Sequence, residues 1–133
     1  RLAYQAYETC MASERWLRLQ AQGARCQRPL WASTSVKNPD YDPTMYVTEL
    51  VAPDTVNTMP EETLEAVAAL PGITGGSITG NYDDAEQVFH ALDRVGVDMD
   101  DVTAVLEEQG VEKFAVSWND LLAAVDSQLA AHR

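Results

Sequence analysis

The segment from residue 28 to residue 60 limits the fold of this chain more than any other. A continuous apolar run predicts a strand over Arg28–Ser33, and residues 33–38 at its end hold three hydroxyls, one lysine and one amide. Hydrophobicity without alternation is typical of a strand that is buried on both faces of a parallel sheet. Polar side chains at the carboxyl end of such a strand lie where α/β proteins bind their ligands. The candidate site is therefore expected in residues 33–38.

The same segment contains the signals for a second strand and two helices. Met45–Val51 is apolar enough for a short helix, and the β-prone residues Thr55–Thr58 predict a strand. Thr58 and Glu61 have the spacing of a capping box, and Pro60 suits the first turn of a helix. A helix is therefore expected to begin at about Pro60.

Helices are also predicted on both sides of this segment. Apolar residues at helical spacing indicate a helix over Arg1–Gln22, and Gly23 follows it where a left-handed cap is expected. A glycine-rich connector over residues 72–80, which lacks the register of a phosphate loop, leads to three further helices. Gly96 and Gly110 are predicted to end the first two of these. Each helix has an apolar stripe, so each is expected to pack against another part of the protein.

Length and charge narrow the possible classes of protein. The 133 residues suffice for about one domain, and no apolar run approaches the roughly 20 residues of a transmembrane helix. The net charge of −12 is uneven, because residues 1–37 carry +4 and residues 38–133 carry −16. An acidic chain argues against nucleic acid and anionic membranes as partners. A small anion, such as a sugar phosphate, could still be held near Lys37.

The sequence gives little support to metal or disulfide chemistry. Cys10 and Cys26 do not form a disulfide framework, so reduced thiols in the cytoplasm are expected. His90 and His132 are far apart and lack the spacing of metal ligands. The aspartates near position 100 lack the glycine and glutamate of a calcium loop and are expected at a helix N-terminus. No metal and no cofactor are predicted.

Three interpretations of Lys37 remain open at the level of residue chemistry. Its ammonium could bind a phosphate together with the neighbouring hydroxyls and loop amides. A lysine desolvated at the mouth of a barrel could instead be a Schiff-base nucleophile. The third interpretation is an exposed surface residue without a role. No Ser/His/Asp or Cys/His set is identifiable in the sequence, so this loop is the candidate site that remains.

A resemblance to a known family bears on these interpretations. Residues 30–67 read LWASTSVKNPDYDPTMYVTELVAPDTVNTMPEETLEAV and resemble the last two barrel strands of transaldolase, in its actinobacterial form. The flanking runs ASERWLRLQAQGARCQRPL and TGNYDDAEQVFHALDRVGVDMDDVTAVLEEQGVEKFAVSWNDLL are similar to the same family, so the resemblance covers essentially the whole chain. Transaldolases are (β/α)₈ TIM barrels that move a dihydroxyacetone unit between sugar phosphates through a lysine Schiff base, without a metal or organic cofactor.

The resemblance implies an α/β fold class in which this chain is the C-terminal part of a (β/α)₈ barrel. The last two strands and then C-terminal helices are expected, in a chain that is mostly α. Such a barrel takes about 250 residues, so a fragment is expected. Residues 1–70 would form the last barrel strands and their helices, and residues 71–133 the connector and the helices that pack on the barrel. The implied function is that of a cytoplasmic transaldolase of the pentose phosphate pathway.

Roles for individual residues follow from the same resemblance. The Schiff-base lysine and its acidic partners are expected in earlier strands, so no catalytic residue is assigned in this chain. Ser33, Ser35 and Lys37 fall in the segment that contributes to the family's sugar-phosphate pocket. Many members carry arginine where Lys37 is found here, and lysine keeps the charge but loses the bidentate geometry.

Partners follow from these expectations, and two rival interpretations stay open. Sugar-phosphate substrates and the remainder of the barrel are the expected partners. Two strands alone would leave open edges, so the isolated chain is predicted to be marginally stable or to self-associate. One rival interpretation is a small, acidic, helical protein-interaction domain in which Phe114 and Trp118 face a partner. The other is a fusion of this segment with a second sugar-phosphate enzyme.

Overall fold

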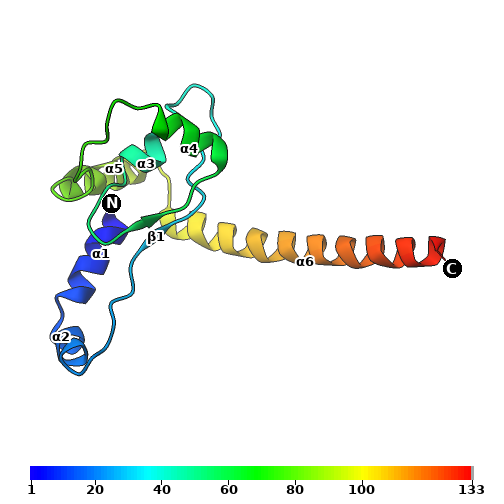
Figure 1. Ribbon diagram of the computed structural model, residues 1–133, viewed down its shortest axis with the longest axis horizontal. Coiled ribbons are helices and arrows are strands. Elements are labelled where there is room, and N and C mark those ends of the chain that lie inside the picture. The colour runs from blue at the N-terminus through cyan, green and yellow to red at the C-terminus, as the bar shows by residue number, and fades with distance from the viewer. Residues whose placement is uncertain (133) are drawn as a thin grey trace. The chain divides into compact units, whose positions relative to one another are not determined.

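A computed structural model describes residues 1–132 of the chain, which is mostly helical and contains one small sheet (Figure 1). The chain divides into two compact units, residues 1–88 and residues 89–133. In chain order the elements are α1 (Leu2–Met11), α2 (Glu14–Ala21), β1 (Leu30–Trp31), α3 (Met45–Thr48), β2 (Val56–Asn57), α4 (Glu61–Ala68), α5 (Tyr82–Arg94) and α6 (Met99–Ala131). The predicted boundary at residues 70 and 71 concerns barrel and post-barrel elements and stays a prediction.

The two predicted strands form and pair in parallel. Leu30 is in register with Val56 and Trp31 with Asn57, and both strands are shorter than predicted. The prediction that the first strand is buried on both faces is wrong for this chain, because the Leu30 side chain is 54% exposed. Within the described residues the sheet has only these two strands, so the outer edge of each has no strand beside it.

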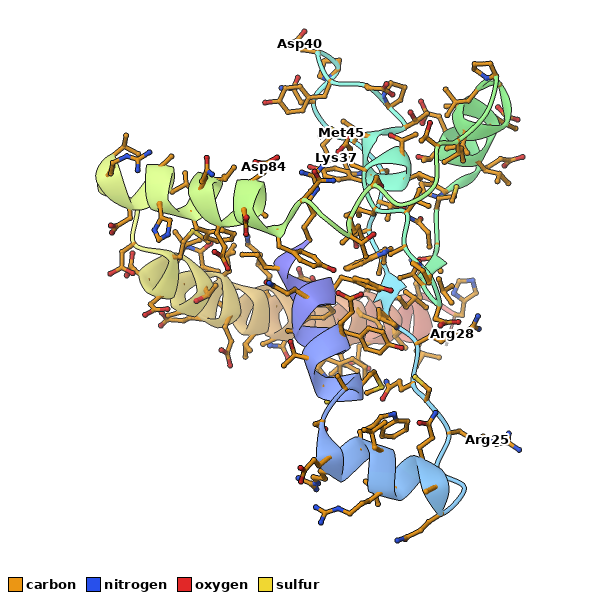
Figure 2. The ribbon with its side chains drawn as sticks, turned by 90° about the vertical axis from the view of Figure 1, so that its left-hand side faces the viewer. Arg25, Arg28, Lys37, Asp40, Met45 and Asp84 are labelled. Atoms are coloured by element: carbon orange, nitrogen blue, oxygen red, sulfur yellow. The ribbon has the colours of Figure 1, made fainter. Side chains whose placement is uncertain are left out.

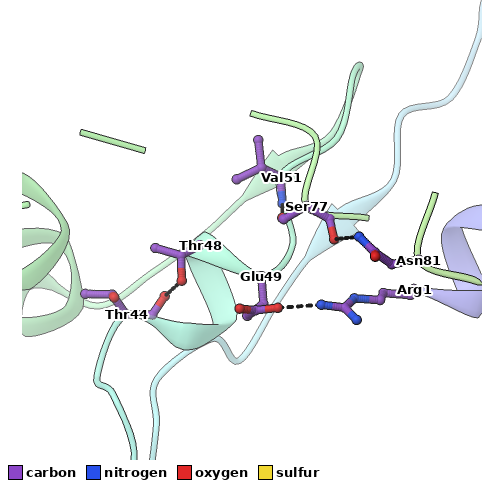
Figure 3. Close-up of polar contacts among 7 residues, drawn as sticks. All are labelled: Arg1, Thr44, Thr48, Glu49, Val51, Ser77 and Asn81. Atoms are coloured by element: carbon purple, nitrogen blue, oxygen red, sulfur yellow. Dashed lines mark hydrogen bonds and ion pairs between the residues drawn. The ribbon is translucent and has the colours of Figure 1, made fainter. Parts of the chain in front are cut away.

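The core of the first unit lies where α1, α3 and the glycine-rich connector meet. Tyr4 is buried and its hydroxyl donates a 2.9 Å hydrogen bond to the Pro53 carbonyl. Ile78 has no exposed surface, and the nearby Ser77 hydroxyl accepts a 2.9 Å hydrogen bond from the Val51 amide (Figure 3). The connector over residues 72–80 therefore contributes to the core as well as joining two helices. The other buried residues are Val47, Thr34, Thr44 and Thr63.

The single helix predicted over Arg1–Gln22 is wrong, because α1 and α2 are separate helices. The Ser13 hydroxyl donates to the Cys10 carbonyl at 2.7 Å and accepts from the Trp16 amide at 3.2 Å. A serine that bonds nearby backbone in this way ends one helix and caps the next. The predicted left-handed cap is confirmed, since Gly23 follows α2 with a φ of 94°.

The capping box predicted before α4 is also wrong. The Thr58 hydroxyl donates to the Trp31 carbonyl at 3.3 Å, and the cap position of α4 is Pro60, which makes no side-chain capping bond. Thr58 still belongs to the end of the strand pair, because its amide also donates to Trp31, at 3.0 Å. A neighbouring strand therefore engages a side chain whose sequence spacing suggested a helix cap.

In the second unit one helix replaces the two that were predicted. α6 runs for 33 residues through Gly110, which does not end it. A glycine in a helix interior costs about 1 kcal/mol, which is too little to stop a long helix. The expected acidic N-terminus is confirmed, because the Asp98 carboxylate accepts hydrogen bonds from the amides of Asp100 and Asp101.

The apolar stripes of this unit are largely exposed, contrary to the prediction that they pack. The Phe114 side chain is 82% exposed, Trp118 60% and Val95 75%. Gly96 ends α5 as predicted, with a φ of 84°. Nothing in residues 1–132 forms a helix that is both long and apolar enough to cross a membrane.

Candidate functional site

The three residues predicted to bind phosphate line one pocket at the carboxyl end of β1. We call it the strand-end pocket, and its volume is about 490 Å³. Ser33, Ser35 and Lys37 come from the loop after β1, Tyr41 comes from the residues that follow, and Tyr46 comes from α3. Val36 and Asn38 complete the lining. The sequence therefore identified three polar residues of this pocket but not its two tyrosines.

A hydrogen bond from a buried side chain anchors the loop that carries Ser33, Ser35 and Lys37. Thr34, between the two serines, is only 2% exposed, and its hydroxyl donates to the Thr58 carbonyl at 2.7 Å. Thr58 directly follows β2, so the loop after β1 is fastened to the end of the neighbouring strand. This contact leaves Ser33 and Ser35, on either side of Thr34, in the lining of the pocket.

Ser33 has a backbone conformation that is uncommon for its residue type. Its φ of 57° lies in the left-handed region, which costs a residue with a Cβ atom about 1–2 kcal/mol. Strained residues of this kind cluster at ligand sites, where the surrounding structure holds them in place. Here the strain redirects the chain immediately after β1, at the point where the pocket begins.

Lys37 is the cation of the strand-end pocket and is exposed to solvent. It lies close to α3, whereas Arg25 and Arg28 extend from the segment between α2 and β1 (Figure 2). The one ion pair within residues 1–132 joins Arg1 and Glu49, so the Lys37 ammonium is not held by a carboxylate (Figure 3). An exposed, unpaired lysine suits anion binding better than nucleophilic catalysis, because a Schiff-base lysine is activated by desolvation.

The sequence interpretation missed the two tyrosines and the residue that positions one of them. The Asn57 side-chain amide donates to the Tyr46 carbonyl at 3.0 Å, which ties α3 to the end of β2. The signal was weak, because Tyr41 and Tyr46 are single aromatic residues, one in a polar loop and one in a short apolar segment. Only the fold of these segments brings them into the pocket that Lys37 also lines.

The other three tyrosines already use their hydroxyl groups. Burial raises the pKa of Tyr4, whose hydroxyl bonds Pro53. A hydrogen bond with the Cys26 thiol raises the pKa of Tyr7 to about 12. Desolvation, together with a hydrogen bond to the Glu8 carboxylate, raises the pKa of Tyr82 to about 12. These groups stay protonated at neutral pH and are engaged away from the strand-end pocket.

The part of the chain that the structure describes contains no group of three or more His, Cys, Asp or Glu side chains placed to hold a metal ion. The two thiols, Cys10 and Cys26, are free and exposed.

Comparisons with known proteins agree on one family. The family described as transaldolase/fructose-6-phosphate aldolase matches residues 1–125. A transaldolase of Mycolicibacterium smegmatis is 58% identical over 131 residues, covering 98% of this chain and 35% of the relative. A transaldolase of Thermobifida fusca is 57% identical, with 99% and 36% covered, and one of Frankia alni is 57% identical, with 97% and 35% covered. The chain thus spans about a third of the length of these relatives.

Proposed function

The chain belongs to the transaldolase/fructose-6-phosphate aldolase family, and from that premise we propose that it forms the C-terminal part of a transaldolase whose strand-end pocket binds the phosphate of a sugar phosphate. The observation that carries this proposal is the convergence of Ser33, Ser35 and the unpaired Lys37 on one pocket at the end of a parallel strand. Hydroxyl and ammonium donors around a concavity suit an anion with several acceptor oxygens.

The proposed reaction transfers a dihydroxyacetone unit from sedoheptulose 7-phosphate to glyceraldehyde 3-phosphate, giving erythrose 4-phosphate and fructose 6-phosphate. A lysine outside residues 1–133 attacks the donor ketone, and loss of water gives a Schiff base. A carboxylate takes the proton of the C4 hydroxyl, and the C3–C4 bond breaks. The aldehyde product departs, and an enamine remains on the lysine. The enamine then adds to the acceptor aldehyde, and water releases the product. Residues of this chain hold the phosphate of the donor until the first aldehyde leaves, and then the phosphate of the acceptor.

The contribution of Lys37 can be given an approximate magnitude. A hydrogen bond to a charged group contributes about 1.5–3 kcal/mol. Lys37→Ala in the complete enzyme is therefore expected to lower kcat/KM for a phosphorylated acceptor by about 10- to 150-fold. Lys37→Arg keeps the charge and should retain most of the activity. An acceptor without a phosphate, such as glyceraldehyde, serves as the control, and its kinetics should change little.

Borohydride trapping separates phosphate binding from nucleophilic catalysis. In the complete Lys37→Ala enzyme, fructose 6-phosphate and borohydride should still give a covalent adduct at high substrate concentration. The isolated chain should give no adduct by intact mass, once circular dichroism has established that it is folded. A reduced sugar on Lys37 itself would contradict the proposal and make this lysine the nucleophile.

The exposed face of α6 favours a second candidate, an acidic helical interaction domain without catalysis. Phe114 and Trp118 are large and mostly exposed in the described residues, and exposed aromatic residues are typical of interaction surfaces. Sedimentation of the complete protein with tryptophan fluorescence decides between the two. Monomers at all concentrations with buried tryptophans would exclude this candidate.

We also propose a cytoplasmic location, because the sugar phosphates of the pathway occur there. Cell fractionation would test this.

A further inference from the structure

Two hollows of the first unit share a wall made of tyrosines. One is the strand-end pocket, and the other has a volume of about 550 Å³. Tyr41 and Tyr46 line both. A phosphate group at Lys37 would fill only a fraction of 490 Å³. The remaining volume has room for the carbon chain that carries the phosphate.

The hydroxyl groups of this wall have no protein partner. Of the five tyrosines, Tyr4, Tyr7 and Tyr82 use their hydroxyls in hydrogen bonds. Within residues 1–132 the hydroxyls of Tyr41 and Tyr46 make none. A phenolic hydroxyl both donates and accepts, which matches the hydroxyl groups of a sugar. Tyr46 is the better positioned of the two, because it belongs to a helix whereas Tyr41 belongs to a loop.

The end of β2 positions both walls of the pocket. Asn57 donates to the Tyr46 carbonyl at 3.0 Å, and the next residue, Thr58, accepts from the Thr34 hydroxyl at 2.7 Å. One strand end therefore holds both α3, which carries Tyr46, and the loop that carries Lys37. The Asn57 side-chain oxygen is buried without a hydrogen-bond partner, which is unfavourable. The bond of its NH₂ group to the Tyr46 carbonyl is the favourable interaction of this side chain.

We propose that Tyr46 is a specificity-determining residue that binds the hydroxylated carbon chain of the substrate, with Asn57 as its positioning residue. This inference rests on the proposed function and names the part of the substrate that the second wall recognises. Lys37 would recognise only the phosphate, whereas Tyr46 would recognise the sugar whether or not it is phosphorylated. The two contributions can therefore be separated by the choice of acceptor.

The test is steady-state kinetics of the complete enzyme with two acceptors, erythrose 4-phosphate and erythrose. Tyr46→Phe is expected to raise KM for both acceptors by the same factor, about 2- to 12-fold for one neutral hydrogen bond, with kcat unchanged. The ratio of the two kcat/KM values should stay at the wild-type value. Tyr82→Phe makes the same chemical change away from the pocket and should leave both KM values unchanged.

Asn57→Ala distinguishes positioning from a merely structural role. If Asn57 positions Tyr46, its variant should raise both KM values as Tyr46→Phe does, while the fraction of enzyme trapped by borohydride stays at the wild-type value. A lower trapped fraction with unchanged KM would refute the positioning role. Wild-type KM values in Tyr46→Phe, or a change confined to the phosphorylated acceptor, would overturn the proposal. The proposed function fails separately if Lys37→Ala leaves the ratio of the acceptors unchanged.

Discussion

The glycine inside α6 offers a direct test of how this chain folds. Gly110 lies in the interior of a 33-residue helix, and a Cβ atom added there would meet nothing within 4 Å. Gly110 is not one of the glycines with a positive φ, which are Gly23, Gly76, Gly80 and Gly96. Gly110→Ala therefore adds no clash and no strain, and alanine is about 0.8–1.0 kcal/mol better than glycine in a helix interior. The substitution should stabilise α6 by about that amount.

Gly96→Ala is the matched control, because its added Cβ atom would also meet nothing within 4 Å. Its φ is 84°, so alanine there should cost about 1–2 kcal/mol. Urea denaturation followed by circular dichroism measures both changes, and amide hydrogen exchange around residue 110 reports on α6 itself. If Gly110→Ala destabilises as Gly96→Ala does, the helix ends at Gly110 in a left-handed turn and the structural argument is refuted.

Three further predictions concern the strand-end pocket and its surroundings. Thr34→Val removes the donor to the Thr58 carbonyl but keeps the shape, so the free energy of unfolding should fall by about 1–3 kcal/mol in urea denaturation; Thr34→Ser should retain most of it, and equal losses would contradict the hydrogen bond. Ser33→Gly should be about 1 kcal/mol more stable than Ser33→Ala, because only glycine adopts a φ of 57° without strain; identical melting temperatures would refute this. Hydrogen bonds from the Thr44 amide and hydroxyl lower the pKa of Asp42 in the folded state. The ionised carboxylate therefore stabilises the fold above its unfolded-state pKa of about 3.9, and this stabilisation is lost as the pH falls through the folded-state pKa. A pH titration followed by carbon NMR should give Asp42 a pKa below that unfolded-state value. Asp42→Asn should lose less stability at acid pH than the wild-type chain.

Much of this protein's identity is readable in its sequence. The family match to residues 1–125 confirms the resemblance to transaldolase. With the parallel pair of β1 and β2 and the mostly helical remainder, it also confirms the predicted fold class. Local signals succeeded where a short range of residues decides the outcome, as at the left-handed cap Gly23 and the acidic start of α6. The phosphate-binding roles of Ser33, Ser35 and Lys37 stay predictions, although the structure places all three in one pocket.

Tertiary structure decided what depends on contacts between distant residues. Thr58 looked like a helix cap, yet its hydroxyl bonds Trp31, 27 residues away in sequence. Tyr46 lines the same pocket as Lys37, and a hydrogen bond ties α3, which carries Tyr46, to Asn57 in the neighbouring strand. Sequence patterns report propensities over a few residues and one helical or strand period. The lining of a pocket is set by hydrogen bonds and packing between segments that are distant in sequence, and no local pattern encodes which segments those are.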